Sequence, residues 1–136
     1  MSLQQLDVLV VDDQPGVRQL LDIVISQAGH RVHTAQNGLE ALEKVRTVRP
    51  QVVFMDVRMP LMDGLEALRR IRRIAPETRV VIMTAYISEH TVKQALEEGA
   101  VCCMVKPFDI REVVALMDDL AHQHYQKSLL LKGCVV

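Results

Sequence analysis

The sequence predicts an α/β protein with a doubly wound, five-stranded parallel sheet, and three observations lead to this prediction. Short, continuous apolar runs recur along the chain, as is typical of strands buried on both faces of a parallel sheet. Each run is followed by a segment whose apolar residues recur at the spacing of one helix face. Strands and helices alternate strictly, which requires right-handed crossovers between parallel strands.

Composition limits the possible functions. The chain has 136 residues, 49% of them apolar, which suits one domain with a sizeable core. A formal net charge of −1 gives no reason to expect nucleic-acid or membrane binding. No apolar run has the length of a membrane span, and the start lacks a signal-peptide pattern. Three cysteines form no readable disulfide framework, so we expect a cytoplasmic protein.

Four of the five expected strands are apolar runs, one of them beginning with Arg79, and the other has mixed apolar and polar character. In chain order, the strands are expected at residues 8–11, 31–35, 52–55, 79–83 and 101–105. The mixed run is the second of these, and its polar flanks favour an edge position in the sheet.

Each expected helix begins at a residue that favours the start of a helix. In chain order, these residues are Pro15, Asn37, Asp63, Ser88 and Asp109. The second, third and fifth of them have Glu three residues later, which resembles a capping box. Gly29, Pro50 and Gly99 are expected to end the first, second and fourth helices.

Polar and charged residues follow four of the expected strands, at the point where each strand ends. Asp12 and Asp13 follow the first strand, Asp56 the third, Thr84 the fourth and Lys106 the fifth. In an open parallel sheet, functional groups lie outside the carboxyl ends of the strands. Taken singly, each residue could cap a helix, begin a turn or carry a solvated charge. Their common location in four loops favours one shared site.

The chemistry of these groups points to phosphoryl transfer. Like charges repel most strongly beside a low-dielectric core, so three carboxylates tolerate one another when a divalent cation lies between them. Mg²⁺ usually takes one or two carboxylates, several waters and a phosphate oxygen. An aspartate can attack phosphorus and form an acyl phosphate. The transfer then needs mainly positioning and charge neutralisation, which Mg²⁺, Lys106 and the Thr84 hydroxyl can supply.

Four motifs resemble those of response-regulator receiver domains of two-component signalling, in that family's order and spacing. They are VVDDQ, MDVRMPLMDG, MTAY and VKPFDI, and the resemblance extends from about Leu6 to His124. It implies a flavodoxin-like (βα)5 fold with strand order 2-1-3-4-5. We therefore expect a receiver domain at residues 4–124 and a C-terminal tail, or the start of a linker, at 125–136.

The resemblance also implies roles for the residues at the strand ends. Asp56 would accept a phosphoryl group from a phosphohistidine of a sensor histidine kinase or a histidine phosphotransfer protein. Asp13, Asp56 and the backbone carbonyl of Arg58 would bind Mg²⁺ directly, and Asp12 would act mostly through water. The domain would be a signalling switch rather than an enzyme, limited to self-catalysed phosphoryl transfer and slow autodephosphorylation.

A switch mechanism follows from the same resemblance. Thr84 would move toward the phosphoryl group, and Tyr86, two residues later, would swing inward behind it. The bond between Lys106 and Pro107 would be cis. These changes would reshape the face formed by the fourth helix, the fifth strand and the fifth helix, which would bind a partner or form a homodimer.

Two other functions compete with the receiver interpretation, the second of them on the same architecture. A phosphatase or dehalogenase with a nucleophilic aspartate would need an Asp-x-Asp motif, but Asp56-Val57-Arg58 lacks the second aspartate. A flavin-binding module would need a phosphate-cradling loop after the first strand, where this sequence has carboxylates that repel phosphate without a metal. Within the receiver interpretation, the chain is either a free-standing relay or the receiver of a longer regulator, such as a transcription activator.

Overall fold

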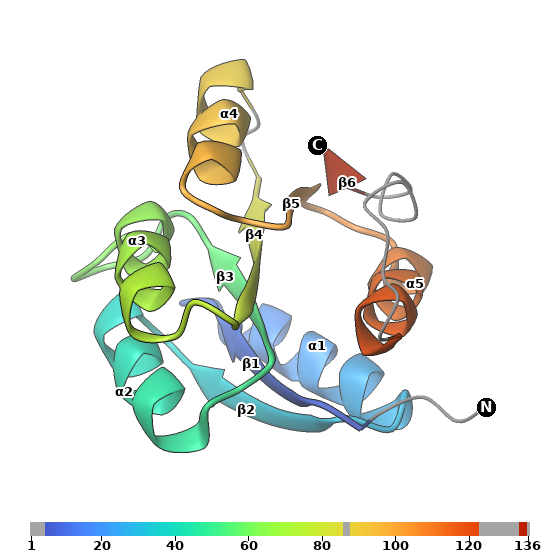
Figure 1. Cartoon of the computed structure of the whole chain (residues 1–136). Coiled ribbons are helices and arrows are strands. Elements are labelled where there is room, and N and C mark those ends of the chain that lie inside the picture. The colour runs from blue at the N-terminus through green and yellow to red at the C-terminus, as the bar shows by residue number, and fades with distance from the viewer. Residues whose placement is uncertain (1–4, 86–87, 123–133, 136) are drawn as a thin grey trace.

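The computed structural model describes residues 5–85, 88–122 and 134–135. Its strands are β1 (Asp7–Val11), β2 (Arg31–Ala35), β3 (Val52–Asp56), β4 (Arg79–Thr84), β5 (Cys102–Val105) and β6 (Cys134–Val135). Its helices are α1 (Pro15–Gln27), α2 (Gly38–Val48), α3 (Gly64–Ile74), α4 (Glu89–Glu97) and α5 (Ile110–Ala121). Figure 1 shows helices on both sides of the strands, with α1 and α5 on one face and α2 and α3 on the other.

The described strands form one sheet in the order β2-β1-β3-β4-β5-β6. Strands β1 to β5 run parallel to one another, which confirms the predicted order 2-1-3-4-5. β2 lies at one edge, as its mixed sequence predicts. The short strand β6 pairs antiparallel with β5 and was not predicted.

The apolar core lies in two layers, one on each face of the sheet. Val8 and Val10 of β1 belong to the layer with α1 and α5. Leu9 and Val11 belong to the layer with α2 and α3. Successive strand side chains point to opposite faces, so a strand covered on both faces needs an uninterrupted apolar run. Burial of each such side chain contributes about 1.5–3 kcal/mol before the entropy cost of ordering the chain.

The predicted helix starts are confirmed. Asn37 and Asp63 each accept a hydrogen bond from the backbone N–H three residues later, at 2.8 and 2.9 Å, and Ser88 does so at 3.1 Å. Asp109 instead accepts from the N–H of Arg111, two residues later. Such caps stabilise a helix by about 1 kcal/mol each. None of the described helices has the length and apolar character needed to cross a membrane.

Strand β6 lies within the segment predicted as a C-terminal tail or the start of a linker. Cys134 stands opposite Met104, and Val135 stands opposite Cys103. Two residues are too few to show the alternation that identifies a strand in a sequence, which explains why β6 was not predicted. Residues 123–133 of the chain lie outside the described residues.

Candidate functional site

The side chains predicted at the strand ends meet at the carboxyl edge of the sheet. Asp12 and Asp13 directly follow β1, and Lys106 directly follows β5. Asp56 and Thr84 are the last residues of β3 and β4, one residue later than the predicted strand ends. Asp56 pairs in register with Met83 and Thr84 with Val105, so the sheet itself holds both positions.

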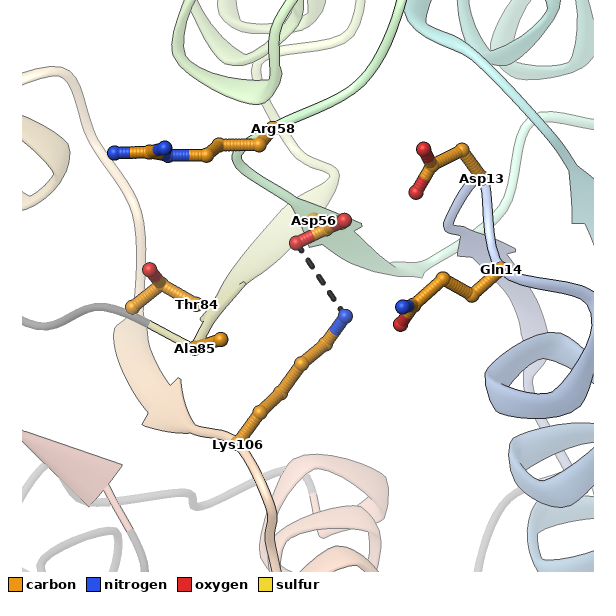
Figure 2. Close-up of a pocket in the computed structure, with 7 residues that line it drawn as sticks. All are labelled: Asp13, Gln14, Asp56, Arg58, Thr84, Ala85 and Lys106. Carbon is orange, nitrogen blue, oxygen red and sulfur yellow. Dashed lines mark ion pairs between the residues drawn. The ribbon is translucent and has the colours of Figure 1, made fainter.

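These residues surround a pocket of about 310 Å³. It is lined by Asp13, Gln14, Asp56, Arg58, Thr84, Ala85 and Lys106. In Figure 2, Asp56 lies in the middle of this group, with Asp13 and Gln14 on one side and Arg58, Thr84 and Ala85 on the other. The Lys106 side chain extends toward Asp56 from the end of β5.

Three carboxylates form a cluster at this pocket. Asp12, Asp13 and Asp56 each have an oxygen within 4.8 Å of the others. Their exposure differs: Asp12 is 0% exposed and Asp56 is 7% exposed, whereas Asp13 is exposed to solvent. The adjacent aspartates of the sequence therefore have different environments, one inside the protein and one at the mouth of the pocket.

Asp12 is held by several hydrogen bonds. The Lys106 ammonium donates to its Oδ2 at 2.5 Å, and the Gln14 N–H donates to its Oδ1 at 3.0 Å. The Arg18 guanidinium donates to its backbone carbonyl at 2.6 Å. A buried carboxylate requires such partners because its charge has lost its water. Both carboxylate oxygens of Asp12 are thus engaged with the protein.

The negative charge of Asp56 is less well balanced by nearby donors than that of Asp12. Burial, and after it the negative charge of Asp12, raises the pKa of its carboxyl to about 6 against the opposing effect of Lys106. The Lys106 nitrogen lies 3.4 Å from Oδ1 of Asp56, which is farther than the 2.5 Å between the same nitrogen and Oδ2 of Asp12. Asp56 is therefore mostly ionised at neutral pH, but at a cost in free energy.

The donor set fits a hard divalent cation. Clustered carboxylate oxygens are the ligands that Mg²⁺ prefers, and Arg58 lines the same pocket. Burial, and after it the charge of Asp12, outweighs Lys106 and raises the pKa of Asp56, so its ionised form carries a free-energy penalty. A cation placed among these oxygens would remove that penalty.

Three further predicted positions are Thr84, Pro107 and Tyr86. Thr84 is 5% exposed and lines the pocket. The peptide bond between Lys106 and Pro107 is cis. Tyr86, the predicted switch residue, lies outside the described residues.

Sequence reasoning missed two residues that line the pocket. Gln14 and Ala85 each directly follow a predicted site residue, which is the signal that could have identified them.

The sequence analysis also did not explain why position 64 is glycine. Gly64 begins α3 and donates its N–H to the Val57 carbonyl at 2.7 Å. A Cβ atom at position 64 would overlap the backbone oxygen of Asp56, so only glycine allows this close approach.

Comparison with known proteins gives consistent matches over this region. The family model described as the response regulator receiver domain matches residues 8–118. Sporulation initiation phosphotransferase F of Bacillus subtilis (strain 168) is 43% identical over 106 residues, which are 78% of this chain and 86% of that protein. Transcriptional regulatory protein ZraR of Klebsiella oxytoca is 42% identical over 129 residues, 94% of this chain. The chain spans only 29% of the length of ZraR.

Solved structures share the same fold. The chemotaxis response regulator CheY4 of Vibrio cholerae superposes with a TM-score of 0.80 at 30% identity, covering 86% of this chain and 99% of that one. The BeF3-activated receiver domain of DrrB gives a TM-score of 0.79 at 27% identity, covering 86% of this chain and 97% of that one.

Proposed function

Because the chain belongs to the response regulator receiver domain family, we propose that it acts as a phosphorylation-controlled switch in two-component signalling, with Asp56 as its phosphoacceptor. The observation that carries this proposal is the position of Asp56. Its carboxylate lines a pocket, lies 3.4 Å from the ammonium of Lys106 and has an oxygen within 4.8 Å of those of Asp12 and Asp13. The phosphodonor is a phosphohistidine of a sensor histidine kinase or a histidine phosphotransfer protein.

The environments of the three aspartates favour Asp56 as the nucleophile. Both carboxylate oxygens of Asp12 accept hydrogen bonds within the protein, and its side chain is fully buried. Asp13 is exposed at the mouth of the pocket, where water solvates its charge. Asp56 combines access from the pocket with partial burial, which leaves its ionised oxygens poorly solvated and therefore more reactive.

The transfer step moves one phosphoryl group between two side chains. An oxygen of the ionised Asp56 attacks phosphorus, the phosphorus–nitrogen bond of the donor breaks, and the departing imidazole takes a proton from solvent. Lys106 and the Thr84 hydroxyl line the same pocket, where they can donate to phosphoryl oxygens. Asp13, Asp56 and the Arg58 carbonyl would hold Mg²⁺, with Asp12 acting through water. The cation would neutralise charge on the phosphoryl oxygens when bound.

The output face follows from the elements that Thr84 and Lys106 terminate. Thr84 ends β4, which leads to α4, and Lys106 links β5 to α5. A phosphoryl group adds roughly one to two negative charges and new acceptor oxygens, which attract both donors. Movement of Thr84 makes room for Tyr86, so a local charge change alters the face formed by α4, β5 and α5. This face binds a partner or a second copy of the chain, and no enzymatic turnover of a substrate is required.

The test uses a small phosphodonor. Incubation with acetyl phosphate and Mg²⁺ should add the mass of one phosphoryl group to the intact protein, and Asp56→Asn should abolish this addition. Asp63→Asn is a matched control, because Asp63 is exposed in the next loop and asparagine caps α3 equally well. Uptake by Asp56→Asn at the wild-type rate would show that another residue is the acceptor.

A further inference from the structure

The edge of β5 that faces away from β4 is covered by the short strand β6 of the same chain. Among the five parallel strands, β5 is last in the sheet order, and β6 pairs with it on the side away from β4. Figure 1 shows β6 beside β5 at that end of the sheet. The pairing is antiparallel, with Val135 opposite Cys103 and Cys134 opposite Met104.

The two ends of the sheet are protected in different ways. An edge strand presents unpaired N–H and C=O groups, which can pair with a strand of another molecule unless charges, proline or a covering segment prevent it. At the β2 edge, Arg31 and His33 both lie close to Asp7, at 2.9 and 3.1 Å, which places charged groups there. The β5 sequence Cys-Cys-Met-Val contains neither a charged residue nor a proline. Its edge therefore depends on β6 for protection.

We propose that Cys134 and Val135 form an intramolecular cap, which blocks pairing of β5 with a second copy of this chain. The cap is easily displaced, because within the described residues β6 has two residues and pairs with β5 alone. Short, singly paired strands belong to the least stable parts of a fold. Displacement of β6 exposes the β5 edge for self-association.

The strand that pairs with the cap leads directly to the proposed phosphorylation pocket. Cys103 and Met104 pair with β6, Val105 pairs with Thr84 in β4, and Lys106 extends into the pocket. Movement of Thr84 and Lys106 toward a phosphoryl group therefore acts on the strand that holds the cap. This link rests on the function proposed above, whereas the cap itself does not.

The position of the cap can be tested by disulfide trapping. Residues directly opposite in an antiparallel pair have Cα atoms about 4.5–5.5 Å apart, within the range for a disulfide. Val135→Cys thus places a thiol opposite the native Cys103. Oxidation with diamide, which takes up the two hydrogens of the thiols, should join the introduced thiol to Cys103, as detected by mass spectrometry of peptides. The double variant Cys103→Ala/Val135→Cys should lack this crosslink, and equal crosslinking in both variants would overturn the cap.

The competition with self-association can be tested by removing the backbone donors of β6. Cys134→Pro/Val135→Pro lacks both N–H groups, and Cys134→Ala/Val135→Ala retains them as a matched control. Sedimentation should show a dimer dissociation constant at least about tenfold lower for the proline variant than for the alanine variant, and oxidised Val135→Cys should stay monomeric. Equal dissociation constants for all three proteins would overturn the proposal.

Beryllofluoride separates the cap from the proposed switch. If the phosphate mimic promotes dimerisation of the wild type but not of the oxidised Val135→Cys protein, the cap is the regulated element. If the mimic changes none of the proteins while the proline variant dimerises, the cap is supported and its link to the phosphorylation pocket is overturned.

Discussion

The free-energy cost of ionising Asp56 should be measurable as a stability difference. In the folded chain, burial and the charge of Asp12 raise the pKa of Asp56 from 3.8 to about 6. A shift of this size corresponds to about 3 kcal/mol at neutral pH, since each pKa unit is worth about 1.4 kcal/mol. Asp56→Asn removes the charge and keeps the shape of the side chain. It should raise the free energy of unfolding by up to about 3 kcal/mol, less the lost attraction to Lys106.

The pH dependence gives the sign of the effect. Between pH 3.8 and about 6, the folded chain binds more protons at Asp56 than the unfolded chain does. The free energy of unfolding therefore falls as the pH rises through this window, and the penalty is complete above it. From about pH 5 to about pH 7.5, the wild type should lose about 1.4 kcal/mol relative to Asp56→Asn.

The assay is urea unfolding of both proteins across this pH range, in the presence of a chelator. The difference between the two curves cancels the contributions of the other titrating groups. Asp63→Asn provides a control, because its carboxyl is exposed and caps α3 as asparagine would. Added Mg²⁺ should stabilise the wild type more than Asp56→Asn at pH 7.5. A difference between wild type and Asp56→Asn that does not change with pH would refute the assignment of an ionisation penalty to Asp56.

Three further predictions concern neighbouring residues. Asp13→Asn should weaken Mg²⁺ binding more than Asp12→Asn does, because Asp12 already bonds to Lys106 and Gln14 while Asp13 lines the pocket. Calorimetric titration with Mg²⁺ measures both affinities, and the opposite ranking would contradict this prediction. Lys106→Met should slow the labelling of Asp56 by acetyl phosphate. It should also move the pH midpoint of the labelling rate above 6, because Lys106 lowers the pKa of Asp56. An unchanged midpoint would disprove this effect of Lys106 on Asp56. Gly64→Ala should lower the free energy of unfolding, measured in urea, by about 3 kcal/mol, because the added Cβ would meet the backbone of β3. A decrease below about 0.5 kcal/mol would show that α3 can shift to make room.

The fold was largely predictable because its signals are local. Apolar runs indicated the five parallel strands, and capping residues such as Asn37 and Asp63 located the helix starts to the residue. The gathering of Asp12, Asp13, Asp56, Thr84 and Lys106 followed from one topological rule about the carboxyl ends of parallel strands. The positions of these residues in the sequence were sufficient to predict that they lie together, because each of them ends a strand or stands just after one.

The internal arrangement of the site was not predictable from position alone. Asp12 and Asp13 are neighbours in the sequence, yet one is buried and bonded to Lys106 and the other is exposed. The bond between Asp12 and Lys106 joins residues 94 positions apart, and no local sequence pattern encodes such a contact. Gly64 shows the same limit, because its requirement comes from the backbone of β3 rather than from the conformation of its own turn.

Lys106 connects the charge state of the pocket to the edge of the sheet. Its ammonium bonds to Asp12 at 2.5 Å and lies 3.4 Å from Asp56, so new negative charge on Asp56 competes directly for it. A shift of Lys106 toward Asp56 weakens its bond to the buried Asp12, whose charge then needs another partner. Since Lys106 directly follows β5, we expect the same shift to act on the strand that pairs with β6. The pairing of β5 with β6 should therefore respond to the charge on Asp56, even though no residue of β6 lines the pocket.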